Sequence, residues 1–115
     1  RLLVAAKERS ALAINYVNGA FQHLDAMQRS CADVLAVDWR HDLGSFRQRV
    51  GDSKALQGNL DPTALFCAPD ELRARVQRLC AGAGRAGHIF NLGHGVLPQT
   101  DPESLRVVLD AARDA

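Results

Sequence analysis

His88-Ile89-Phe90-Asn91-Leu92-Gly93-His94-Gly95 joins a short apolar run to a histidine that stands between two glycines. A short apolar run bounded by turn residues is typical of a strand buried in a parallel sheet. The glycines on either side of His94 let the backbone bend sharply and approach a ligand closely. His94 is therefore predicted at the carboxyl end of a strand, where α/β barrels build their active sites.

Three earlier stretches repeat this arrangement of a short apolar run followed by polar or turn residues. The runs cover residues 12–17, 34–37 and 55–57, and they end in Asn18-Gly19, Asp38-Trp39-Arg40 and Gly58-Asn59-Leu60-Asp61-Pro62. Each run suits a strand that is buried on both faces of a parallel sheet.

Helical patterns alternate with the predicted strands. Apolar residues recur at helical spacing in segments 21–30, 43–50 and 70–80, and residues 2–8 form a helix end before the first strand. Glycine-rich residues 81–84 end the third of these helices. The last helix begins at residues 101–103, with proline at its first position and an acid in its first turn. We expect its buried face to consist of Leu105, Val108, Leu109 and Ala112.

This alternation favours a parallel sheet with right-handed crossovers. A complete eight-unit barrel needs about 250 residues, whereas this chain has 115. We therefore predict that residues 1–115 form a partial single domain, the C-terminal half of a (β/α)8 TIM barrel. The alternative is a small complete flavodoxin-like domain, which would carry an early phosphate-binding loop that the sequence lacks.

Composition excludes several classes of function. The 14 basic and 13 acidic residues give a net charge of +1, so we expect no nucleic-acid partner. No apolar run reaches the roughly 18 residues of a membrane helix, so no membrane partner is expected. Three cysteines without framework spacing indicate reduced thiols and a cytoplasmic location.

Several motifs, taken together and in order, resemble the uroporphyrinogen decarboxylase family. Their order and spacing agree from about residue 11 to residue 112, which corresponds to roughly the last third of that family's chain. The motifs are Val37-Asp38-Trp39-Arg40, Arg49-Val50-Gly51, Leu56-Gln57-Gly58-Asn59-Leu60-Asp61-Pro62, Gly87 to Pro98, and Asp101-Pro102-Glu103.

The resemblance implies a cofactor-free and metal-free carboxy-lyase of haem and chlorophyll biosynthesis. Such an enzyme removes the four acetate carboxyls of uroporphyrinogen and yields coproporphyrinogen, usually as a homodimer. Protonation of the electron-rich pyrrole at carbon makes the ring an electron sink for loss of carbon dioxide, and the site stabilises the resulting cation. The resemblance carries over one side chain, His94, as a contact to a substrate carboxylate. The family's substrate-binding aspartate and arginines have no counterpart in this chain, so we expect the isolated chain to be inactive.

Other residues at the predicted strand ends are candidates for supporting the site. These are Asn91, Gly93, Gly95, Asn59, Tyr16 and Asn18. Taken as a lone histidine, His94 would be a loop residue held by backbone hydrogen bonds, but its flanking glycines favour ligand contact. We expect Asn59 to organise a loop, and Tyr16 and Asn18 to face the cleft.

The remaining strand-end residues have structural interpretations. Asp38 either orients Arg40 or, as we favour, caps the next helix or makes a hydrogen bond in the core. Arg40 forms a surface ion pair, with neutralisation of a carboxylate as its alternative, and Trp39 packs between barrel and helix. Asp61 and Pro62 start a turn toward Leu65.

Two alternative functions stay open. Cobalamin- and coenzyme-M-dependent methyltransferases share the barrel but bind zinc, and the corresponding positions here are Tyr16, Asn18 and His94 rather than a set rich in cysteine. The second alternative is a non-catalytic fragment or interaction module. A half-barrel exposes two strand edges, and we expect these edges to promote self-association.

Overall fold

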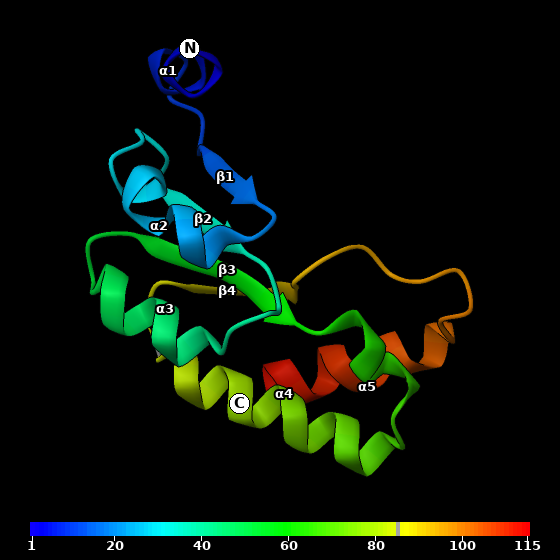
Figure 1. Ribbon diagram of the computed structural model, residues 1–115. Coiled ribbons are helices and arrows are strands. Elements are labelled where there is room, and N and C mark those ends of the chain that lie inside the picture. The colour runs from blue at the N-terminus through cyan, green and yellow to red at the C-terminus, as the bar shows by residue number, and fades with distance from the viewer. Residues whose placement is uncertain (85) are drawn as a thin grey trace.

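The computed structural model describes residues 1–84 and 86–115 as an α/β fold, in which strands and helices alternate (Figure 1). The elements in chain order are α1 (Leu2–Glu8), β1 (Ile14–Val17), α2 (Ala20–Gln28), β2 (Val34–Val37), α3 (Leu43–Val50), β3 (Ala55–Leu60), the short 3-10 helix η1 (Pro62–Phe66), α4 (Pro69–Ala83), β4 (His88–Leu92) and α5 (Pro102–Arg113).

The strands form one parallel sheet in the order β1-β2-β3-β4, so that each strand pairs with the next one in the sequence. The register aligns Tyr16 with Ala36, Ala36 with Gln57, and Gln57 with Ile89. Consecutive order is that of a barrel segment, whereas a flavodoxin-like sheet places its second strand at the edge. The predicted partial barrel is confirmed, and the flavodoxin-like alternative is wrong.

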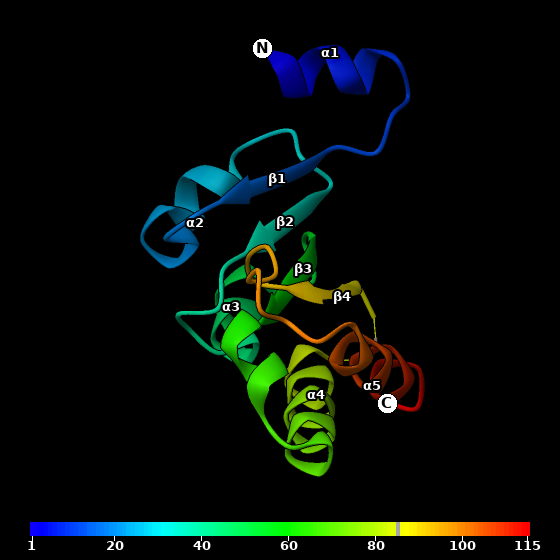
Figure 2. The same ribbon diagram turned by 90° about the vertical axis from the view of Figure 1, so that its right-hand side faces the viewer.

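Helices α2, α3, α4 and α5 pack against one face of the sheet (Figure 2). One core cluster joins α2 and α3 to β2 and β3 around Leu24, Leu35, Phe46 and Leu56, all of which are fully buried. A second cluster joins α4, α5 and η1 to the far end of β3 and to β4. The core therefore lies on the helix-covered face only, and it fixes the strand ends from that side.

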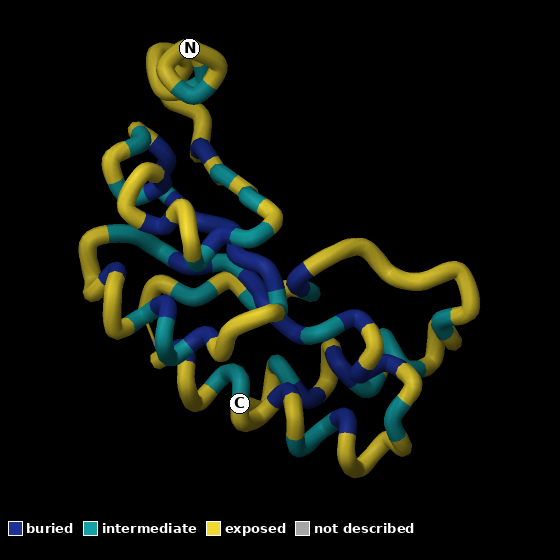
Figure 3. Tube along the Cα trace, viewed as in Figure 1, coloured by how far each residue is buried: buried dark blue, intermediate teal, exposed yellow. Residues whose placement is uncertain are grey.

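The other face of the sheet is open, which corrects the expectation that every strand is buried on both faces. Only β2 is buried at each position, while β1 and β4 alternate between exposed and half-buried residues (Figure 3). Ile14, Tyr16 and Ile89 are consequently more than a third exposed. In the described residues, no helix covers these side chains. No described helix is long and apolar enough to cross a membrane.

Two element predictions also need correction. The third strand runs through Gly58 to Leu60 rather than ending at residue 57. The buried side of α5 is centred on Val108 and Ala111, which pack against α4, whereas Leu109 is half exposed.

Carboxylate caps explain where several helices begin. Asp42 accepts a hydrogen bond from the Ser45 amide at the start of α3, and Asp101 accepts one from the Glu103 amide at the start of α5. Asp61 does the same for Thr63, so the predicted Asp61-Pro62 turn is confirmed as the start of η1. Gly84 ends α4 at φ 79°, a backbone conformation that favours glycine.

Candidate functional site

A cavity of about 480 Å³ lies on the open face of the sheet, toward the carboxyl ends of the strands. It is formed by side chains that alternate along the strands and by the loop after β4. The lining residues are Ile14, Tyr16, Ala36, Val37, Gln57, Asn91, Leu92, Gly93, His94 and Gly95. In a parallel β/α fold this is the end at which ligands bind, because the loops that follow the strands converge there.

Tyr16 connects the first strand to the loop after the last one. Its hydroxyl donates a hydrogen bond to the Gly93 carbonyl oxygen over 3.1 Å. Partial burial raises the pKa of the Tyr16 phenol, the negative charge of Asp38 raises it further, and the positive charge of Arg40 opposes this. The phenol therefore stays protonated at neutral pH and keeps its hydrogen bond to the Gly93 carbonyl oxygen.

His94 is exposed on the cavity wall and is held from one side by Trp39. The two rings meet edge to face, with centroids 5.6 Å apart. A Cβ at Gly93 would lie 2.6 Å from the Trp39 backbone nitrogen, so only glycine permits this approach of the loop after β4 to the loop after β2. Trp39 thus packs on the site loop, a contact that its predicted position between barrel and helix did not include.

A cluster of polar side chains joins the carboxyl ends of β1 and β2. The fully buried Asp38 carboxylate accepts hydrogen bonds from the Gly19 amide and from Arg40. The Arg40 Nη1 atom also donates to the Asn18 side chain over 2.5 Å. Asp38 therefore orients Arg40, and the cap of the next helix is Asp42 instead. Arg40 forms the predicted ion pair, but its partner is a buried rather than a surface carboxylate.

The structure brings together five of the seven predicted site residues. His94, Tyr16, Asn91, Gly93 and Gly95 line the cavity. The two asparagines predicted beside them do not line it. Asn18 instead binds Arg40. Asn59 lies within β3 rather than in a loop, and its Nδ2 atom donates to the Asp38 and His41 carbonyl oxygens at 2.7 Å each. From inside the strand it fixes the loop after β2.

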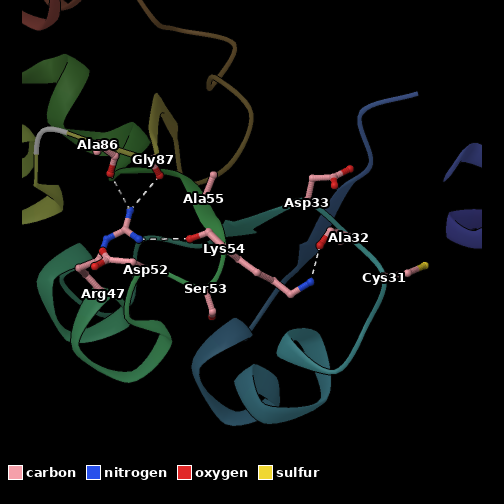
Figure 4. Close-up of a pocket in the computed structure, with 10 residues that line it drawn as sticks. All are labelled: Cys31, Ala32, Asp33, Arg47, Asp52, Ser53, Lys54, Ala55, Ala86 and Gly87. Atoms are coloured by element: carbon pink, nitrogen blue, oxygen red, sulfur yellow. Dashed lines mark hydrogen bonds between the residues drawn. The ribbon is translucent and has the colours of Figure 1, made fainter. Parts of the chain in front are cut away.

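A second cavity, of about 430 Å³, lies at the opposite, amino-terminal ends of β2, β3 and β4 (Figure 4). Its two cations are committed to main-chain carbonyls. Lys54 donates to the Ser30 and Ala32 oxygens. The Arg47 guanidinium donates to the carbonyl oxygens of Gly51, Lys54, Ala83, Ala86 and Gly87. These bonds tie α3, α4 and β4 together, so this end of the sheet serves stability.

Metal ligands do not gather in the described residues, which contain no group of three or more His, Cys, Asp or Glu side chains placed around one point. At the three positions that align with the zinc-binding alternative, only His94 is a good zinc ligand. The cavity can instead offer hydrogen-bond donors from an imidazole and from side-chain amides.

Consecutive parallel strands, helices on one face and a cavity at the strand ends on the other define the class of this protein: a segment of a (β/α)8 barrel. The family model of uroporphyrinogen decarboxylase (URO-D) matches residues 1–115. The chain belongs to the uroporphyrinogen decarboxylase family.

Curated relatives agree with this assignment. The chain is 47% identical over 103 residues to a uroporphyrinogen decarboxylase of Methylococcus capsulatus, covering 89% of this chain and 29% of the relative. It is 48% identical over 96 residues to one of Saccharophagus degradans, covering 83% and 27%. The chain thus spans less than a third of the length of either relative.

A solved structure supports the fold independently of close sequence similarity. A methyltransferase from Methanosarcina mazei superposes with a TM-score of 0.82 over 98% of this chain and 34% of its own. The sequences are 19% identical, so the similarity extends to the fold alone.

Proposed function

We propose that this chain supplies part of the substrate site of a uroporphyrinogen decarboxylase. The reaction replaces each of four acetate side chains of uroporphyrinogen by a methyl group and yields coproporphyrinogen. Each step breaks one carbon–carbon bond, releases carbon dioxide and adds one proton to the remaining carbon. We further propose that the complete enzyme is a cytoplasmic homodimer that needs neither metal nor cofactor.

One observation carries the proposal: His94 lines a cavity at the strand ends in a chain that belongs to this family. A polycarboxylate needs donors that remain in place when it binds. Trp39 supports the His94 ring, and the Tyr16 hydroxyl fixes the Gly93 carbonyl next to it. A donor pre-oriented in this way binds a carboxylate without the cost of ordering a free side chain.

A chimera tests the proposal. It is the Methylococcus capsulatus relative in which this chain replaces the matching segment, so that the rest of the barrel is present. The chimera is incubated anaerobically with uroporphyrinogen, and the products are separated by chromatography. We expect the chimera to release coproporphyrinogen. A folded chimera that produces none would refute the proposal, and the unmodified relative is the positive control.

The His94→Ala variant of the chimera tests the residue. We expect kcat/KM to fall about 10- to 100-fold, as loss of a hydrogen bond to a charged group predicts, without unfolding. His23 is exposed on α2, so His23→Ala is the matched control and should leave the rate unchanged. Equal kinetics of the His94→Ala chimera and the parent chimera would exclude the proposed contact.

A further inference from the structure

Arg40 lies on a rigid support beside Trp39, whose ring contacts His94 of the cavity lining. Its Nη1 atom donates to Asp38, which is fully buried, and to Asn18, which follows β1. The guanidinium carbon lies 4.5 Å from the centre of the Trp39 ring. The same indole contacts His94 from another direction. Arg40 and His94 are therefore neighbours of one aromatic side chain and are held in a fixed relation by it.

Much of the guanidinium remains available to a ligand. The side chain is 47% exposed. Its hydrogen bonds to the described residues use the Nη1 atom and leave Nε and Nη2 free. These atoms present parallel N–H groups, the geometry that binds both oxygens of a carboxylate.

The cavity itself lacks a permanent charge. Its lining consists of apolar, amide, phenol and imidazole side chains together with glycines. A ligand with several carboxylates needs a cation that this lining does not contain, and Arg40, beside the Trp39 ring that contacts His94, is a cation close to the cavity. The buried Asp38 holds the arginine in place through one carboxylate oxygen, and its other oxygen has no hydrogen-bond partner in the described structure.

We propose that Arg40 binds a second carboxylate of the substrate, next to the one bound by His94, and so contributes to substrate specificity. The proposal rests on the proposed function, because it takes the ligand to be a polycarboxylate. Arg40 binds the substrate in the ground state and in the transition state alike. Its loss is therefore expected in KM rather than in kcat.

The experiment must separate ligand binding from support of Asp38, because removing Arg40 alone leaves a buried charge unpaired and destabilises the fold. We therefore compare Asp38→Asn with Asp38→Asn/Arg40→Ala in the chimera. The double variant is expected to raise KM about 10- to 100-fold over the single variant, with kcat within about twofold. Arg40→Lys should give an intermediate KM, since an ammonium keeps the charge but loses the two-pronged geometry.

Arg49 provides a matched control. It also pairs with an aspartate, Asp25, at 2.9 Å, lies 4.8 Å from the ring centre of Phe21 and is 40% exposed, but it belongs to α3 on the helix-covered face. Arg49→Ala should leave KM unchanged. An equal KM for the single and double variants overturns the role of Arg40 while leaving the decarboxylase assignment intact.

If the parent chimera does not turn over uroporphyrinogen, the role of Arg40 is tested by binding of uroporphyrin, a stable oxidised polycarboxylate. Its dissociation constant is then measured by porphyrin fluorescence for the same variants. If the dissociation constant of the double variant exceeds that of the single variant about tenfold or more, the role of Arg40 is supported even though the chimera does not decarboxylate uroporphyrinogen. Equal dissociation constants refute the Arg40 proposal on binding alone.

Discussion

Gly93 shows how a single residue without a side chain sets the geometry of the site. It lies one residue before His94, and its amide donates to the Leu60 carbonyl oxygen over 2.8 Å. Its carbonyl oxygen accepts from Tyr16, and its α-carbon faces the Trp39 backbone. Strands β1 and β3 and the loop after β2 are thereby connected through one position, and the loop that carries His94 cannot shift without breaking these contacts.

Gly93→Ala is expected to destabilise the chimera by about 1–3 kcal/mol, because the new Cβ would lie 2.6 Å from a backbone nitrogen that cannot move away freely. The loss of stability should be accompanied by displacement of the Trp39 indole, and Trp39 is the only tryptophan of this chain. Urea unfolding measures the first effect, and a crystal structure or nuclear magnetic resonance of the indole measures the second.

Gly95→Ala is the control for this prediction. A Cβ at Gly95 meets no atom within 4 Å, and the position needs no left-handed backbone. The control should change the free energy of unfolding by less than about 0.5 kcal/mol. Similar losses for the two variants would mean that the close approach to Trp39 is unimportant.

At the scale of elements, helix α3 depends on its cap. The Asp42 side chain accepts hydrogen bonds from the Ser45 hydroxyl and the Ser45 amide, and these bonds lower the pKa of the Asp42 carboxyl. The helix carries Phe46, which is fully buried in the core beneath β2 and β3. Capping α3 therefore stabilises the packing that supports the strand ends.

Asp42→Ala is expected to cost about 1 kcal/mol of unfolding free energy at neutral pH. Because the folded pKa is lower than the unfolded one, the cap contributes fully above the unfolded pKa of about 4 and loses its contribution as the pH falls through the folded value. The parent and the variant should therefore converge in stability under acid. Urea unfolding of both chimeras across pH 3 to 7 provides the measurement.

Asp110 supplies the comparison for Asp42. Its carboxylate is largely exposed, and its nearest cation is a neighbouring arginine on the same helix at 4.0 Å. Asp110→Ala should cause no loss of unfolding free energy that is present at neutral pH and disappears in acid. If the Asp42 variant kept a constant deficit down to pH 3, the cap would not be the source of its stability.

The elements were predictable to the extent that local pattern determines them. The β2 strand coincides with its apolar run because every residue of that run is buried. The end of β3 was missed because Gly58 and Asn59 are poor strand formers. A Cβ at Gly58 would lie 2.7 Å from the Val37 carbonyl oxygen, so glycine here serves close strand packing. For α5, neighbouring α4 decides which side is buried, and helical spacing alone does not contain that information.

The site was predictable only at single positions. The glycines around His94 indicated a ligand-binding strand end, and the cavity lies there. The bond from Tyr16 to Gly93 joins residues 77 positions apart. The contact of Trp39 with His94, like the support of Arg40 by a buried aspartate, depends on tertiary structure in the same way. Periodicity describes one segment at a time, so it could not reveal contacts between segments.

At the scale of the whole molecule, the sheet is open at both edges. In the described residues, β1 and β4 each pair with one neighbouring strand. The radius of gyration is 14.5 Å, larger than the roughly 13 Å of a compact domain of about this size. The α1 helix buries no residue and stands apart from the sheet in Figures 1 and 2. These features identify surfaces that the remaining units of a barrel would cover.

The isolated chain is expected to self-associate through these edges, because unpaired strand groups next to exposed apolar side chains promote pairing with another chain. Light scattering over a concentration series should give masses above the 12.5 kDa of one chain. Ile14→Lys/Ile89→Lys places a charge on each edge strand, where both side chains are at least 40% exposed, and should shift the chain toward the monomer. Leu109→Lys, on the exposed side of α5, is the control and should leave the association unchanged. A parent chain that stays at 12.5 kDa throughout the series would show that open edges alone do not drive association.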